Sequence, residues 1–151
     1  MSWHITVSSV DAVGSRMDSI HNNLHSRLEE AMAISVRDVQ ERARANHRFT
    51  TRTGEAERSI EAKVSGSGDS ITGEVGTTRL ITIYLHQGTK AHDIEPRSKK
   101  VLRWASGGKF VFAKRAHNPG IKKDPFIFNA EEAEAGAIKQ RFDDIIEGLE
   151  G

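Results

Sequence analysis

A regular apolar pattern between Val13 and His47 constrains the fold more than any other feature of this 151-residue chain. Apolar and small residues recur there at steps of three and four, which is the spacing of one face of an α-helix. They are Val13, Met17, Ile20, Leu24, Leu28, Ala31, Ser35, Val39 and Ala43, and Ile34 and Val36 widen the stripe near its middle. A helix of about 35 residues is roughly 50 Å long. The pattern therefore predicts that part of the helix protrudes or packs against another subunit, and that its middle is contacted on more than one side.

A shorter helical pattern closes the chain. We expect Asp124 as the N-cap of this helix and Pro125 as its first residue, because these residue types favour those positions. Its apolar stripe consists of Phe126, Ala130, Ala133, Ala137, Ile138, Phe142, Ile145 and Leu149.

Strand patterns lie on both sides of the long helix. Alternation of apolar and polar residues predicts strands at 59–65 and 70–77, joined by a glycine-containing turn at 66–69. A short half-buried strand is also predicted at residues 3–7, where Trp3, Ile5 and Val7 alternate with polar residues. The segment 80–87 is ambiguous, since its β-branched residues favour a strand but do not exclude a short helix.

A strongly basic hairpin is predicted at residues 98–114, with its turn at Gly107-Gly108. Its large apolar residues are expected on one shared face: Leu102, Trp104, Phe110 and Phe112. The sequence therefore predicts a single α+β domain over residues 1–151. In it a small antiparallel β-sheet is packed by a long N-terminal helix and a shorter C-terminal helix, and an extended basic β-hairpin is attached.

The charge of the chain is unevenly distributed although its net value is only +1. Residues 1–96 carry a net charge of −2, residues 97–123 carry +9 without one acidic residue, and residues 124–151 carry −6. Opposite charges of this size either pair within one subunit or meet an identical neighbour head to tail. The candidate residues for a partner or subunit interface are Arg97, Lys99, Lys100, Arg103, Trp104, Lys109, Phe110, Phe112, Lys114 and Arg115.

Direct contact with DNA is the alternative use of this hairpin, because each Lys or Arg on a phosphate releases counterions and the aromatic rings can stack on bases. Regular apolar alternation is more typical of a structure that is packed against protein. We therefore favour a protein interface over a DNA interface.

Residues that carry catalysis or bind metals form no strong pattern. The chain has no cysteine, and a zinc site needs three or four convergent ligands. His86, His92 and His117 lie near Asp93 and Glu95 in the sequence, but we expect His86 and His117 to bond backbone groups in tight turns. We predict no metal, no cofactor and no enzymatic activity.

The sequence Glu61-Ala-Lys63 is half of a Mg²⁺-dependent nuclease signature and keeps that activity open as a further alternative. Alternation along the predicted strand places both side chains on the solvent face, where polar pairs are expected in any case. No apolar run approaches ~18 residues, so neither membrane spanning nor export is indicated.

Short motifs follow one another in a distinct order from residue 53 to residue 133. They are Thr53-Gly54, Ser59-Ile60, Tyr84, Gly88-Thr89, Ile94 and Pro96, Leu102, His117, Pro119-Gly120 and Pro125-Phe126. In this order they resemble the motifs of the head–tail joining, or tail-completion, proteins of long-tailed bacteriophages. The resemblance implies that residues 80–87 form a short helix. It also implies a structural virion protein of the neck, without catalytic residues.

The resemblance further implies the partners and the location. The expected partners are further copies of the chain in a hexameric ring, in keeping with the six-fold tail, together with the tail terminator, the tail tube and the connector or stopper proteins. Phage DNA is expected to pass through or contact such a ring. The location is the head–tail junction of the virion, and the host cytoplasm during assembly.

Overall fold

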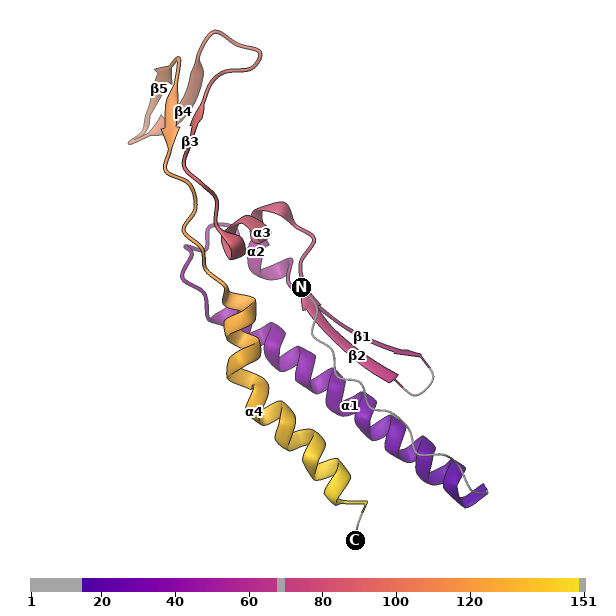
Figure 1. The fold of residues 1–151 in the computed structure, drawn as a ribbon. Helices are drawn as coiled ribbons and strands as arrows, with labels where there is room; N and C mark the ends of the chain where they lie inside the picture. Colours follow the sequence, from indigo (N-terminus) through magenta and orange to yellow (C-terminus); the bar gives the residue numbers. More distant parts are fainter. Residues whose placement is uncertain (1–14, 68–69, 150–151) are drawn as a thin grey trace.

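The computed structural model of the protein describes residues 15–67 and 70–149, so the strand predicted at residues 3–7 lies outside the described residues. Its elements are α1 (Ser15–Ala45), α2 (Glu55–Arg58), β1 (Glu61–Ser67), β2 (Ser70–Gly76), α3 (Leu80–Gln87), β3 (His92–Ile94), β4 (Leu102–Ser106), β5 (Lys109–Ala113), β6 (Ala116–Asn118) and α4 (Phe126–Glu147). Within the described residues the strands pair as antiparallel two-stranded ribbons, β1–β2, β3–β6 and β4–β5 (Figure 1). The predicted α+β class is confirmed, with separate ribbons in place of one small sheet.

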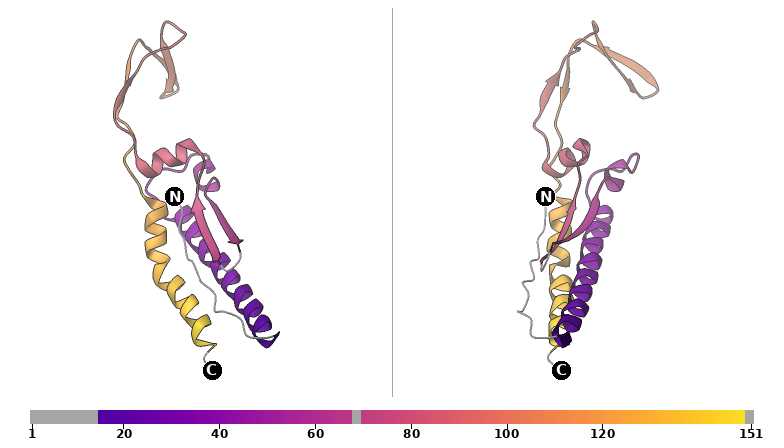
Figure 2. Two further views of the ribbon diagram at one scale, coloured as in Figure 1. Left: turned by 45° about the vertical axis from the view of Figure 1, so that its right-hand side comes forward. Right: turned by 90° about the vertical axis from the view of Figure 1, so that its right-hand side faces the viewer.

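Helix α1 is the centre of the packing and confirms the long helix. The β1–β2 ribbon lies along one side of α1 and α4 lies along another (Figure 2). Arg141 near the end of α4 donates to Asp38 at 2.7 Å, while Arg42 pairs with Glu134 nearer the start of α4. The two helices therefore run antiparallel.

The buried face of α1 is wider than a single stripe because it meets two partners. Its buried residues are Leu28, Ala31, Met32, Ser35, Val36, Val39 and Ala43. Met32 and Val36 provide the extra width, whereas Ile34 is 42% exposed, so including Ile34 in the stripe was wrong. Ile20 is 53% exposed, and α1 thus extends beyond the buried core, as its length predicted.

The β1–β2 ribbon lies close to α1 because of one glycine. A Cβ atom added to Gly73 would lie 2.5 Å from Cγ1 of Val36 and 2.6 Å from Sδ of Met32. Ile71 and Val75, on either side of Gly73, are buried against the core as predicted. The absence of a side chain at Gly73 therefore sets the distance between the ribbon and the helix.

The ambiguous segment 80–87 forms helix α3, which is the alternative that the resemblance favoured. Thr82 is fully buried on this helix, and its hydroxyl lies 2.8 Å from the hydroxyl of Ser59. This contact joins α3 to the end of α2. The β-branched residues are accommodated because the helix is only two turns long and is held by tertiary contacts.

Helix α4 begins one residue later than predicted. Pro125 occupies the N-cap position, and no side chain caps the first turn. The carboxylate of Asp124 is buried and accepts a hydrogen bond from the backbone N–H of Arg48 instead. Asp124 thus ties the exit of α1 to the start of α4, and its expected role as an N-cap was wrong.

The predicted stripe of α4 is confirmed only in part. Its buried residues are Phe126, Ile127, Ala130, Ile138, Phe142 and Ile145. Ala133, Ala137 and Leu149 are exposed, contrary to the prediction. The core contact is made by the large side chains at the two ends of the helix, while the small residues in its middle face solvent.

Candidate docking site

Residues 89–121 form an arm that projects from the body beyond α3 (Figure 2). Its foot is a two-residue bridge between Thr89 and Ile121. The N–H of Thr89 donates to the carbonyl of Ile121 at 2.9 Å, and the N–H of Ile121 donates to the carbonyl of Thr89 at 3.2 Å. The hydroxyl of Thr89 accepts from the same N–H of Ile121 at 2.9 Å. The arm is therefore clamped where it leaves the body.

Two glycines allow the outgoing and returning segments of the chain to lie so close together at this foot. Gly88 and Gly120 have φ values of 78° and 82°, in the left-handed region that favours glycine. A Cβ at Gly88 would lie 2.9 Å from the carbonyl oxygen of Ile121, and one at Gly120 would collide with the carbonyl oxygen of Thr89. The side-chain oxygen of Asn118 accepts from the N–H of Gly120 at 2.9 Å and holds this turn. These backbone demands explain both glycine motifs.

Above the foot, ribbon β3–β6 carries a small ionic cluster. His117 Nδ1 lies 2.9 Å from Asp93 Oδ1, and Arg115 pairs with the other oxygen of Asp93. These hydrogen bonds, first that from His117 and then that from Arg115, lower the pKa of Asp93 below its ordinary value. The expectation that His117 bonds the backbone was therefore wrong. Among the described residues no group of three or more His, Cys, Asp or Glu is placed to hold a metal ion.

Ribbon β4–β5, the hairpin, forms the outer part of the arm and confirms the predicted hairpin. Its face assignment was wrong, however. Trp104 lies opposite Val111, and Arg103 lies opposite Phe112, so Trp104 is on one face and the two phenylalanines are on the other. The reason is that a two-residue turn at Gly107-Gly108 pairs even-numbered residues with odd-numbered ones. Both faces of the hairpin are therefore apolar.

These apolar residues lie largely in solvent. Phe110 and Phe112 are each 61% exposed, Trp104 is 41% exposed and Val111 is 37% exposed. The only described covering of Phe110 is the guanidinium of Arg103, which lies 4.7 Å from the ring centre. An isolated two-stranded hairpin is marginally stable in water. The two strands of the hairpin therefore leave its large apolar side chains uncovered.

The basic residues between Arg97 and Lys123 are exposed to solvent, as the apolar side chains of the hairpin are. All nine between Arg97 and Lys123 are exposed, and within residues 15–67 and 70–149 only Arg115 has an ion-pair partner. The acidic helix α4 lies on the other side of the foot, away from the hairpin (Figure 1). The opposite charges therefore do not neutralise each other within one copy. All ten predicted interface residues, Arg97, Lys99, Lys100, Arg103, Trp104, Lys109, Phe110, Phe112, Lys114 and Arg115, are exposed on the arm.

A histidine that the sequence analysis misjudged lies beneath the arm. His86 is 3% exposed, and neither ring nitrogen has a hydrogen-bond partner among the described residues. Its ring lies 5.2 Å from that of Phe126 and 4.9 Å from that of Phe128. Burial, and then the charge of Lys123, lowers the pKa of His86, while Asp124 opposes that change. The expected backbone hydrogen bond was wrong, and no pattern in the sequence indicates this burial.

Some residues of the family-like motifs lie at the foot of the arm, and others, such as Leu102 in β4, lie further out on it. Gly88, Thr89 and Gly120 form the foot, and fully buried Phe126 packs below it. The carbonyl of Tyr84 accepts from the N–H of Gly88 at 2.8 Å. The remaining motif residues flank these: Pro96 follows β3, His117 lies in β6, Pro119 precedes the glycine turn, and Pro125 starts α4. The Gly88-Thr89 and Pro119-Gly120 motifs, about thirty residues apart in the sequence, thus both shape the foot of the arm.

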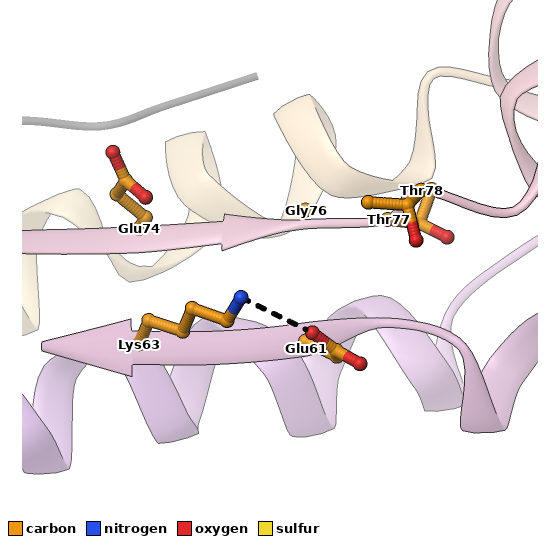
Figure 3. A pocket seen from close by; sticks show the side chains of 6 residues that line it. All are labelled: Glu61, Lys63, Glu74, Gly76, Thr77 and Thr78. Atoms are coloured by element: carbon orange, nitrogen blue, oxygen red, sulfur yellow. Dashed lines mark ion pairs between the residues drawn. The ribbon is translucent and has the colours of Figure 1, made fainter.

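The two residues of the nuclease signature, Glu61 and Lys63, lie on β1. Lys63 Nζ lies 3.5 Å from Glu61 Oε2, and both side chains are more than 60% exposed. Glu74 lies opposite Lys63 in the ribbon, but its carboxylate points away from the pair (Figure 3). Alternation had placed these side chains on the solvent face, and this is confirmed. Glu61 and Glu74 line one shallow pocket with Lys63, but their carboxylates point apart (Figure 3), which is not the convergent arrangement that holds a catalytic metal.

One groove was not anticipated from the sequence. A cavity of about 540 Å³ opens beside the foot of the arm, between the loop 49–54 and α3. Its apolar wall consists of Phe49, Ile81, Leu85 and Ile121. It extends the apolar surface of the arm onto the body.

None of the helices in the described residues combines the length and the apolar character needed to cross a membrane. No protein-family model, no curated protein and no solved structure matches the chain.

Proposed function

We propose that the protein is a structural component of the head–tail junction of a long-tailed bacteriophage, where it joins or completes the tail as a homo-oligomeric ring. The observation that carries the proposal is the exposed arm. It is fixed to the body by a glycine-dependent foot, carries apolar side chains on both faces and has seven basic residues without an ion-pair partner in the described chain. The order of motifs around the foot, which resembles that of tail-completion proteins, supports the same function.

The energetics of the hairpin favour a protein partner. Burying apolar surface contributes about 25 cal/mol per Å², and large aromatic residues with Arg are the residues that most often dominate binding. The hairpin presents Trp104, Phe110, Phe112 and Arg103 together. A partner that covers both faces also provides the additional packing that a two-stranded ribbon lacks.

The asymmetry of the subunit supports a ring. The arm projects from one end, and the surfaces that are available for it on the body are different in shape and charge. A contact between different surfaces of identical chains is heterologous, and it closes into a ring when the rotation between neighbours allows. The hexameric number is taken from the symmetry of the tails to which the family resemblance points.

The proposal is tested by assembly in the phage that encodes the chain. Replacing Lys99, Lys100 and Arg103 by Glu should leave the subunit folded and yield filled heads and free tails that are not joined, as seen by electron microscopy of the lysate. The matched control reverses three exposed basic residues of the body, Arg37, Arg52 and Lys63, and should give normal virions. Normal yield from the arm variant would overturn the proposed role.

DNA binding is the second candidate, because the exposed basic and aromatic residues of the arm also suit a nucleic-acid strand. In that case the isolated protein binds short DNA, and the logarithm of the binding constant falls linearly with the logarithm of salt concentration. Binding that survives high salt, or no binding at all, leaves the protein interface as the function of the arm.

A further inference from the structure

We propose that the hairpin of one copy docks on the solvent-facing side of α4 in a second copy. This inference deepens the proposed ring, since it names the two surfaces that join neighbouring subunits. Its four supports are the composition of the α4 surface, the charges, the separation of the two surfaces within one copy, and their dimensions.

The outer side of α4 is apolar and acidic where a free helix face is normally only polar. We define this outer face by Phe128, Glu132, Asp143, Ile146 and Glu147, which lie opposite the buried stripe of the helix. Phe128 is 47% exposed and Ile146 is 51% exposed. Between them Ala133, Ala135, Gly136 and Ala137 are small and exposed. An apolar face with carboxylates around it suits a basic, aromatic partner.

The charges of the two surfaces are complementary. Residues 97–115 carry seven basic and no acidic residues, or +7, whereas α4 carries six acidic and two basic residues, or −4. Both basic residues of α4 are already occupied, Lys139 by Asp143 and Arg141 by Asp38. In the part of the chain that the structure describes, Glu132 and Glu147 have no ion-pair partner. They are therefore available to the unpaired cations of a hairpin.

These surfaces cannot meet within one subunit. The hairpin projects beyond α3, while α4 runs from the foot of the arm in the opposite direction (Figure 2). The foot holds this separation, because the chain crosses there through Gly88 and Gly120 with no room for side chains. The hairpin of one copy can reach only the α4 of another. Repetition of this contact gives the head-to-tail arrangement of a ring.

The dimensions of the two elements are also compatible. Strands β4 and β5 have five residues each, and a strand rises about 3.3 Å per residue, so the hairpin is roughly 17 Å long. Helix α4 has 22 residues and is roughly 33 Å long. One hairpin therefore fits along about half of the helix. The remaining length accommodates the flanking basic residues.

A charge-swap experiment tests this interface with the full chain. One variant, K99E/K100E/R103E/K109E, changes the charge of residues 97–115 from +7 to −1, and a second variant, E132K/D143K/E147K, changes the charge of α4 from −4 to +2. The wild-type protein should be oligomeric at low salt by native mass spectrometry, and each variant alone should be monomeric because like charges then face each other. An equimolar mixture should regain the oligomer with equal numbers of the two variants, since both of its hairpin–helix contacts are again between opposite charges.

Matched controls separate loss of the interface from loss of the fold. Each variant should keep the wild-type circular dichroism spectrum and a similar melting temperature, and the double reversal R37E/K63E should remain oligomeric. A monomeric wild type, a variant that stays oligomeric alone, or a mixture that stays monomeric would each overturn the inference. An oligomer that survives both reversals overturns only this interface, whereas the proposed role at the head–tail junction is judged separately by virion assembly.

Discussion

Replacing His86 by Leu should stabilise the protein, although His86 is in the core. Both ring nitrogens are buried without a partner among the described residues, and an unpaired buried polar group costs about 1–3 kcal/mol. Leu removes this cost but loses the ring contacts with Phe126 and Phe128, which contribute about 0.5–1.5 kcal/mol. We therefore expect a net gain of about 1 kcal/mol in the free energy of unfolding at pH 7.5.

The gain should grow as the solution becomes more acidic. The pKa of His86 in the folded protein is lowered from its ordinary value of 6.5 by burial and by Lys123. As pH falls below 6.5, the unfolded chain binds a proton at this histidine before the folded chain does, so the wild type loses stability. The loss ends once the pH passes below the folded pKa. Within that window the wild type loses up to about 1.4 kcal/mol of unfolding free energy for each pH unit. The Leu variant has no histidine at this position and does not show this loss.

The assay is urea unfolding, followed by circular dichroism, of wild type and variant at pH 7.5, 6.5 and 5.5. The comparison isolates His86, because every other titrating group is shared by the two proteins. His92→Leu at an exposed position is the control and should change stability by less than about 0.5 kcal/mol at each pH. A Leu variant that is less stable at pH 7.5, or a stability difference that does not change with pH, would refute the reasoning.

Three further substitutions test the packing. Gly73→Ala should cost about 1–3 kcal/mol of unfolding free energy, because the new methyl group collides with Val36; chemical denaturation measures it, and an unchanged midpoint would contradict the close approach of the ribbon to α1. Gly120→Ala places a side chain at φ 82° against the carbonyl of Thr89, so protease cleavage in the arm should become faster while the unfolding of the helical body changes little. Equal cleavage rates in the variant and the wild type would contradict the proposed role of the foot in holding the arm. Phe126→Ala removes a fully buried ring and should cost about 3–5 kcal/mol by thermal or urea unfolding, and a loss under 1 kcal/mol would disprove its central place in the core.

Two of the wrong sequence predictions have different causes. The shared face of Trp104 and the phenylalanines was an error of register, and the information was present: a two-residue turn at Gly107-Gly108 places Ser106 opposite Lys109, which sets the parity of every other pair. The role of Asp124 was not present in any local pattern. Its carboxylate is taken by the N–H of Arg48, 76 residues away, and only the packed fold brings these groups together.

The sequence by itself determined the local elements of this protein: the long helix, the two hairpins, the C-terminal helix and the glycine turns. These depend on apolar periodicity and on backbone conformations that only a few residue types adopt, so they can be read over short distances. The tertiary structure alone decided that His86 lies buried without a partner among the described residues and that the basic arm lies away from the acidic helix. Burial and charge separation are sums over contacts between distant segments, and no short stretch of sequence contains them.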